Sequence, residues 1–225
     1  MPLFVITVII SACSMIYELL LAQSMTILYG HATSRYSLTI GLFLFSLGMG
    51  TLAYAPLRRR YDKTKLFINL EILLCLAGVF TPIIIFSAAA SPIAENIAPD
   101  IGFYFCHFWI LVIGFLTGIE VPCLLDKGEG LDQIGNNTFL ILSFDFLGTF
   151  LGVILFVFFL YPVIGIVGAA AVTGGLNGIA ALILWNDSQT KSRSQLFFVT
   201  MSVGLSIVLF MYRGEASAFL IERAF

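Results

Sequence analysis

The chain has 225 residues, of which 60% are hydrophobic and only 11% are charged, with a formal net charge of -2 and a mean hydropathy of +1.03. Soluble domains carry about 25% charged residues, so this composition excludes a soluble globular protein. The charges are also segregated between long apolar runs. We therefore predict an all-α, polytopic transmembrane helix bundle, with one helical domain over residues 1–225.

The first apolar run, residues 2–29, is long enough to cross a bilayer, since about 20 apolar residues span a hydrocarbon core of about 30 Å. It lacks a charged leading region and a small-residue cleavage site, so we expect a retained span. The run contains a carboxylate, Glu18. A charge in the middle of such a run costs at least about 2.5 to 3.5 kcal/mol, which marks Glu18 as a candidate functional residue.

Further apolar runs follow at intervals along the chain, separated by short polar segments. We predict seven spans, at about residues 2–29, 37–56, 66–89, 101–125, 137–160, 163–185 and 195–212. The intervening segments include polar loops at 91–100, 126–136 and 186–194, and a turn consisting only of Tyr161 and Pro162. The tail from residue 213 is expected to be short and mixed in character.

The distribution of basic residues predicts the orientation. Three segments on one side, residues 57–65, 126–136 and 186–194, hold eight of the eleven Lys and Arg residues. The positive-inside rule therefore places the N-terminus in the cytoplasm and, with seven spans, the C-terminus outside. We also expect close helix packing at three small-residue segments, residues 46–50, 148–152 and 174–178.

Cysteines and histidines give no sign of a metal site. Neither CxxC nor Cys/His spacing occurs, and the two histidines, His31 and His107, lie far from each other among scattered acids. We expect no metal, no cofactor and no nucleic-acid partner. The four cysteines fall in apolar runs and are expected to pack as small hydrophobic residues: Cys13, Cys75, Cys106 and Cys123.

Polar side chains recur within the predicted spans, and their rise per residue places them at two levels. Glu18 lies about 22 Å from the cytoplasmic edge, and His107 lies about 8 Å from the outer edge, close to the same level. The inner group lies about 8 to 12 Å from the cytoplasmic edge and consists of Glu71, Glu120, Asp145 and Asn177. Buried acids beside aromatic side chains suit an organic polycation or a proton-coupled carrier.

Each of these residues also has a structural interpretation. Glu71 can extend to the interface beside Lys65, and Glu120 can extend toward Lys127. Asn177 and His107 can be satisfied by neighbouring helices. Glu18 and Asp145 are too deep to reach the interface easily, so they are either functional or hydrogen-bonded as protonated acids.

Several segments resemble one family. Residues 11–20 (SACSMIYELL), 41–51 (GLFLFSLGMGT), 145–152 (DFLGTFLG) and 160–165 (LYPVIG) are similar, in order and spacing, to motifs of the integral-membrane region of bacterial membrane-bound spermidine synthases. These proteins are described as fused transporter-like/spermidine synthase proteins. Tyr17, Glu18 and Asp145 fall on the motif positions.

In that family a soluble aminopropyltransferase domain, which uses decarboxylated S-adenosylmethionine, follows the last span. The present sequence has no strand followed by a Gly-rich nucleotide turn, and it stops at Phe225. The resemblance therefore implies a stand-alone membrane half in a bacterial inner membrane, which we expect not to synthesise spermidine itself.

Three functions remain open. The chain is a non-catalytic membrane subunit that anchors or assembles with a separate partner, such as an aminopropyltransferase; or it is a carrier or binding protein for a polyamine-like cation; or it is a membrane enzyme that uses the acids or His107 in acid–base chemistry. The candidate ligand-binding residues are Tyr17, Glu18, Glu71, His107, Glu120, Asp145 and Asn177.

Overall fold

The computed structural model describes residues 2–91, 100–128, 134–188 and 191–224. This part of the chain is almost entirely helical and contains no strand. The elements are α1 (Pro2–Tyr29), α2 (Ala32–Arg60), α3 (Lys63–Ala89), α5 (Ile101–Gly128), α6 (Ile134–Leu155), the π-helix η1 (Phe156–Ile164), α7 (Gly165–Asp187), α8 (Arg193–Met211) and α9 (Arg213–Ala224).

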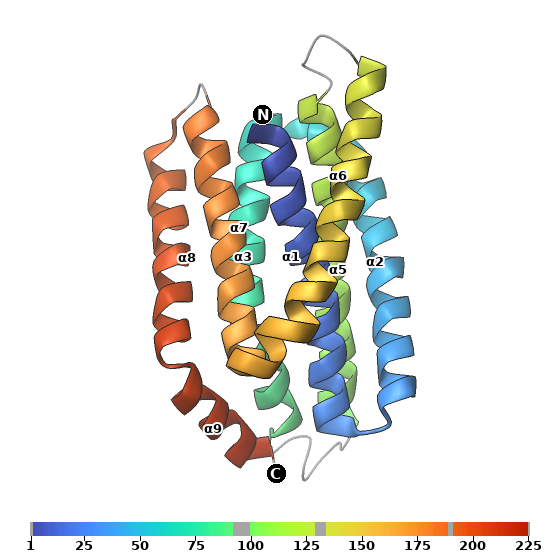
Figure 1. The fold of residues 1–225 in the computed structure, drawn as a ribbon, viewed down its shortest axis with the longest axis vertical. Helices are drawn as coiled ribbons and strands as arrows, with labels where there is room; N and C mark the ends of the chain where they lie inside the picture. Colours follow the sequence, from blue (N-terminus) through green and yellow to red (C-terminus); the bar gives the residue numbers. More distant parts are fainter. Residues whose placement is uncertain (1, 92–99, 129–133, 189–190, 225) are drawn as a thin grey trace.

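Six continuous helical stretches are long and apolar enough to cross a membrane. One of them, Thr138–Asp187, has 50 residues and doubles back, so that α6 and α7 run in opposite directions (Figure 1). Each of the seven predicted spans corresponds to one long helix, with residues 137–160 covering α6 and part of η1. The predicted all-α polytopic bundle is confirmed.

The helices extend beyond the predicted spans at their polar ends. Most of the predicted loop 57–65 is helical, because α2 continues to Arg60 and α3 begins at Lys63. Asp62 caps α3 by accepting a hydrogen bond from the Lys65 backbone N–H at 2.9 Å. Residues 92–99, 129–133 and 189–190 lie outside the described residues, and with them much of the other predicted loops.

The C-terminal tail is a twelve-residue helix, α9, where the sequence predicted a short mixed segment. It packs on α3, α7 and α8 at the end of the bundle opposite the N-terminus (Figure 1). Leu220 is buried, whereas Glu215 and Phe219 are exposed. The helix was missed because its polar content is too high for a membrane span.

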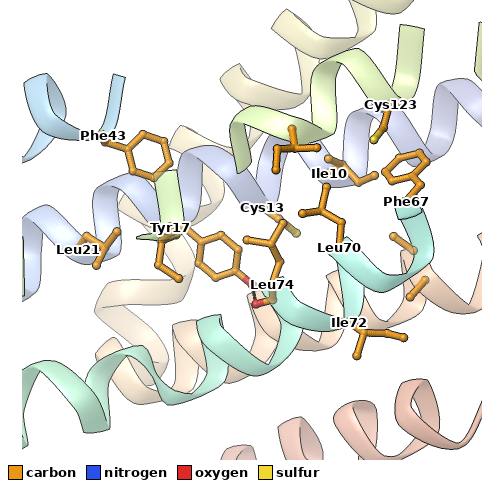
Figure 2. Packing of buried hydrophobic residues seen from close by; sticks show 14 of the residues in the cluster. Ile10, Cys13, Tyr17, Leu21, Phe43, Phe67, Leu70, Ile72, Leu74 and Cys123 are labelled. Carbon is orange, nitrogen blue, oxygen red and sulfur yellow. Dashed lines mark hydrogen bonds between the residues drawn. The ribbon is translucent and has the colours of Figure 1, made fainter. Parts of the chain in front are cut away.

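Helix α1 forms the centre of the bundle, in contact with α2, α3, α5, α6 and α7. Its side chains Ile10, Cys13, Tyr17 and Leu21 are fully enclosed and lie against residues of α3 such as Leu74 (Figure 2). By contrast, the outward faces of α2 and α6 expose large apolar side chains such as Phe45 and Phe150. Such faces suit contact with lipid.

Two small-residue seams bring helices together closely. A Cβ atom at Gly50 of α2 would lie 2.1 Å from the Phe115 carbonyl oxygen of α5, and one at Gly118 would lie 2.1 Å from the Leu47 carbonyl oxygen. Gly148 and Gly152 of α6 approach the backbone of α1 in the same way. Only a residue without a side chain fits at these positions. Gly48, which we also expected to pack, faces open space.

An ion-pair cluster joins α2, α3 and α5 at the N-terminal end of the bundle. Asp126 accepts from Arg58 Nε at 2.9 Å, from Lys63 Nζ at 2.7 Å and from the Tyr54 hydroxyl at 2.5 Å. The carboxylate is almost wholly buried, while its two basic partners are about half exposed. The cluster therefore ties together the ends of three helices, two of which, α2 and α5, line the cavity described below.

A carboxylate-lined cavity as the candidate functional site

A cavity of about 410 Å³ lies between α1, α2, α5 and α6. It forms where α2 packs on α5 and α6 packs on α1, while in the described residues α2 and α6 scarcely touch each other. Its lining comprises Ile10, Ser11, Ser14, Met15, Glu18, Leu44, Leu47, Thr117, Glu120, Val121, Leu124, Asp145, Phe146 and Thr149.

Helical spacing explains why these residues share the cavity. On α1, Ser11, Ser14 and Glu18 recur at intervals of three and four residues and therefore lie on one face. The same spacing brings Thr117 together with Glu120 on α5, and Asp145 together with Thr149 on α6. Each of the three helices therefore contributes a carboxylate and at least one hydroxyl.

The three carboxylates are Glu18, Glu120 and Asp145, and among the described residues no Lys, Arg or His lines the cavity with them. Glu18 is 8% exposed and Glu120 only 2% exposed, while Asp145 is partly buried. Asp145 accepts a hydrogen bond from Ser11 Oγ at 2.5 Å. The cavity therefore gathers up to three negative charges in a largely apolar wall.

The cavity joins acids that the sequence places at two depths. Glu18, Glu120 and Asp145 all line it, because it extends along α1 for more than two turns. The alternative that Glu71 and Glu120 extend to the interface toward Lys65 and Lys127 is wrong, since both side chains are buried. Their helices turn these side chains into the bundle, where packing against neighbours outweighs access to the interface.

Glu71 lies behind the cavity. Its side chain is fully buried and does not line the cavity, but its carboxyl group interacts directly with that of Glu120 across the α3–α5 interface. Neither carboxyl oxygen of Glu71 has a hydrogen-bond partner, and the same holds for Oε1 of Glu120. Buried polar atoms are normally hydrogen-bonded, so these unpartnered oxygens are unusual.

Tyr17 and Asn177 point away from the cavity. Because Tyr17 precedes Glu18 by one residue, it faces another side of α1, toward α3 and α7 (Figure 2). Its hydroxyl donates to the Leu74 carbonyl at 3.0 Å and accepts from Asn177 Nδ2 at 3.2 Å. The structure therefore places these two residues in an interhelical hydrogen-bond network.

His107 also lies apart from the cavity. Its Nδ1 is 2.7 Å from the Phe103 carbonyl, and its ring packs on the Phe103 ring with centroids 4.0 Å apart. These contacts engage only one ring nitrogen, because the buried Nε2 has no hydrogen-bond partner among the described residues. Of the seven candidate residues, the structure brings Glu18, Glu120 and Asp145 together, with Glu71 adjacent to Glu120.

The hydroxyls of the cavity, Ser11, Ser14, Thr117 and Thr149, were not among the candidates from the sequence. Their signal was available, because polar side chains within a predicted span repeat at three- and four-residue intervals with the acids. Among the described residues, no group of three His, Cys, Asp or Glu side chains lies close enough to hold a metal ion.

Comparison with known proteins finds several relatives that are all named polyamine aminopropyltransferase. The chain is 29% identical over 220 residues to a polyamine aminopropyltransferase of Oceanobacillus iheyensis, covering 96% of this chain and 41% of that protein. It is 31% identical over 186 residues to a polyamine aminopropyltransferase of Leptospira interrogans, covering 81% of this chain and 35% of that protein.

The chain thus spans about two fifths or less of the length of these relatives. A protein named polyamine aminopropyltransferase 2 from Aquifex aeolicus matches at 30% identity over 74% of this chain and 32% of its own length. No family model matches, and no solved structure gives a significant match. Over most of its length, the chain is similar to one part of proteins named polyamine aminopropyltransferase.

Proposed function

We propose that this protein is an integral-membrane binding protein for a small organic polycation of the polyamine class. The observation that carries the proposal is the cavity in which Glu18, Glu120 and Asp145 meet without a basic residue. Buried charges need partners of opposite sign, and here the protein supplies none among the lining residues. A cationic ligand would supply them.

The shape of the site favours a cation with separated charges. Its volume of about 410 Å³ falls within the range of about 300–1,000 Å³ that is typical of small-molecule sites. The carboxylates come from three helices and are not clustered as metal ligands are. Several amines joined by apolar carbon chains would match carboxylates joined by apolar wall, with Met15 and Phe146 against the methylene groups.

The names of the relatives support the same ligand class. Proteins named polyamine aminopropyltransferase share 29% to 31% identity with this chain over most of its length. The carboxylate-lined cavity supports the same ligand class independently of these names. A bacterial inner membrane is the proposed location.

The proposal is tested by measuring spermidine binding to the purified protein by isothermal titration calorimetry. We expect a saturable site in the wild type and its loss in the double variant Glu18→Gln, Asp145→Asn, because both charges are removed with little change in shape. Glu215→Gln is the matched control, since it removes an exposed carboxylate on α9. Equal binding by the wild type and the double variant would refute the site. Spermidine uptake by proteoliposomes would then distinguish a carrier from a binding protein.

We propose a cytoplasmic N-terminus, because the predicted cytoplasmic side carries eight of the eleven Lys and Arg residues. Arg60→Cys and Glu215→Cys lie near opposite ends of the bundle and are exposed. All four native cysteines are buried, so their background labelling should be low. In intact cells, an impermeant thiol reagent should label Glu215→Cys and not Arg60→Cys. The reverse pattern would invert the topology.

A second candidate function is that of a non-catalytic membrane subunit that assembles with an aminopropyltransferase. The observation in its favour is that the chain matches only one part of relatives bearing that name. Gentle purification from native membranes followed by mass spectrometry tests it. A stoichiometric aminopropyltransferase partner would support this role, and a chain that is isolated alone would count against it. Assembly and cation binding are compatible with each other.

A further inference from the structure

The feature that the proposed cation site does not use is the carboxyl pair formed by Glu71 and Glu120. Glu71 is 0% exposed and does not line the cavity, and both of its carboxyl oxygens are without hydrogen-bond partners. An ionised carboxylate in such a place lacks both solvent and a donor. Its burial therefore requires a partner that the protein's other side chains do not provide.

Glu120 connects this pair to the cavity. It lines the cavity, is 2% exposed, and interacts with Glu71 across the interface of α3 and α5. A hydrogen bond between two carboxyl groups exists only when one of them carries a proton, since ionised carboxylates have acceptors alone. A shared proton would therefore be the donor that the unpartnered oxygens lack.

No cation near the pair replaces that proton. The described Lys and Arg residues lie at or beyond the ends of the helices. At one end of α5, Arg58, Lys63 and Lys127 form ion pairs with Asp126 and Asp187, and near its other end Arg35 stacks on the Phe103 ring. Two ionised carboxylates side by side in a medium of low polarity repel strongly, so that one of them retains a proton.

The titratable groups that face the pair do not change this conclusion. Among the described residues they reach it from α1, α3, α5 and α6, and none is basic. The facing groups are Cys13, Tyr17, Cys75, Cys123 and Asp145. The environment of the pair is thus neutral or acidic on every side.

We propose that Glu71 and Glu120 share a proton in the empty protein, and that a cation entering the cavity displaces it. The cation pairs with ionised Glu120 from the cavity side, and the proton leaves through the cavity that Glu120 lines. Binding of the cation is thereby coupled to release of about one proton. This inference rests on the proposed function and assigns Glu71 the role of a positioning residue behind the site.

The test is isothermal titration of spermidine in two buffers of different ionisation enthalpy at the same pH, which measures the protons released on binding. The wild type should release about one proton from the pair. Glu71→Gln should still bind spermidine but release about one proton fewer than the wild type, because the amide can donate to Glu120 and leave it ionised beforehand. Glu215→Gln, the control on the exposed face of α9, should behave as the wild type.

The outcomes separate this inference from the proposed function. Absence of spermidine binding would refute both, whereas binding with no proton release, or with release unchanged in Glu71→Gln, would refute only the coupling. If Glu71→Gln fails to fold, infrared difference spectroscopy of the wild type decides. Adding spermidine should remove a band of a protonated carboxyl group, and its persistence would overturn the proposal.

Discussion

Replacing Gly50 with alanine should separate α2 from α5 and destabilise the bundle. The added Cβ would lie 2.1 Å from the Phe115 carbonyl oxygen and 3.1 Å from the Gly118 Cα. Both neighbours belong to the backbone, so no side-chain rotation can relieve the overlap. To restore an ordinary contact of 3.4 Å from 2.1 Å, the two helices must move apart by about 1.3 Å.

The size of the effect follows from the extent of this interface. Overpacking a closely packed site typically costs about 1–3 kcal/mol. For a chain of 150–250 residues, each 1 kcal/mol lowers the melting temperature by about 2–4 °C. We therefore expect Gly50→Ala to lower it by about 2–12 °C. Because α2 and α5 also form two walls of the cavity, spermidine binding should weaken as well.

Thermal unfolding in detergent, followed by circular dichroism, measures this effect. The control is Gly48→Ala, two residues away on the same helix, where an added Cβ meets nothing within 4 Å. It should melt at or above the wild-type temperature, since alanine favours the helix more than glycine does. Equal melting temperatures for Gly50→Ala and Gly48→Ala would show that the two helices do not approach each other as described.

Two further variants test the polar contacts that hold the helices around the site. Asp126→Ala removes both ion pairs and the Tyr54 hydrogen bond at the end of the bundle, and should lower the free energy of unfolding by about 1–3 kcal/mol. Thermal unfolding over a salt series measures this loss, which should be smaller at high salt. No loss at any salt concentration would show that the cluster does not stabilise the bundle. Tyr17→Phe leaves Asn177 Nδ2 without its acceptor and should lower the free energy of unfolding by about 1–2 kcal/mol in the same assay. Spermidine binding should stay unchanged, because Tyr17 does not line the cavity. Weakened binding with unchanged stability would instead place Tyr17 in the binding site.

The spans could be predicted from the sequence because lipid imposes a simple length requirement on apolar runs. Residues 2–29 agree with α1 to the residue, and the reversal near Tyr161 and Pro162 was also expected. The turn itself is a π-helix that ends at Ile164 and is capped by Gly165, whose φ of 72° suits glycine. Such local geometry depends on how α6 and α7 pack and has no distinct sequence pattern.

The rotation of each helix was harder to predict. In a soluble bundle, an apolar stripe marks the buried face, but lipid is as apolar as the interior, so the stripe is absent. The sequence therefore left open whether Glu71 and Glu120 extend to the interface or face the bundle, and the structure shows that both are buried. The repeat of hydroxyl and carboxyl groups on α1, α5 and α6 was the remaining signal, and it required reading three helices together.

The most direct test of the account is mass spectrometry of the small molecules that accompany the protein when it is purified gently from its native membrane. We predict a bound polyamine-like amine that is absent from the Glu18→Gln, Asp145→Asn variant and retained by Glu215→Gln. A wild-type protein that carries no amine, or one that carries the same amount as the double variant, would contradict the assignment of the carboxylate-lined cavity as a cation site.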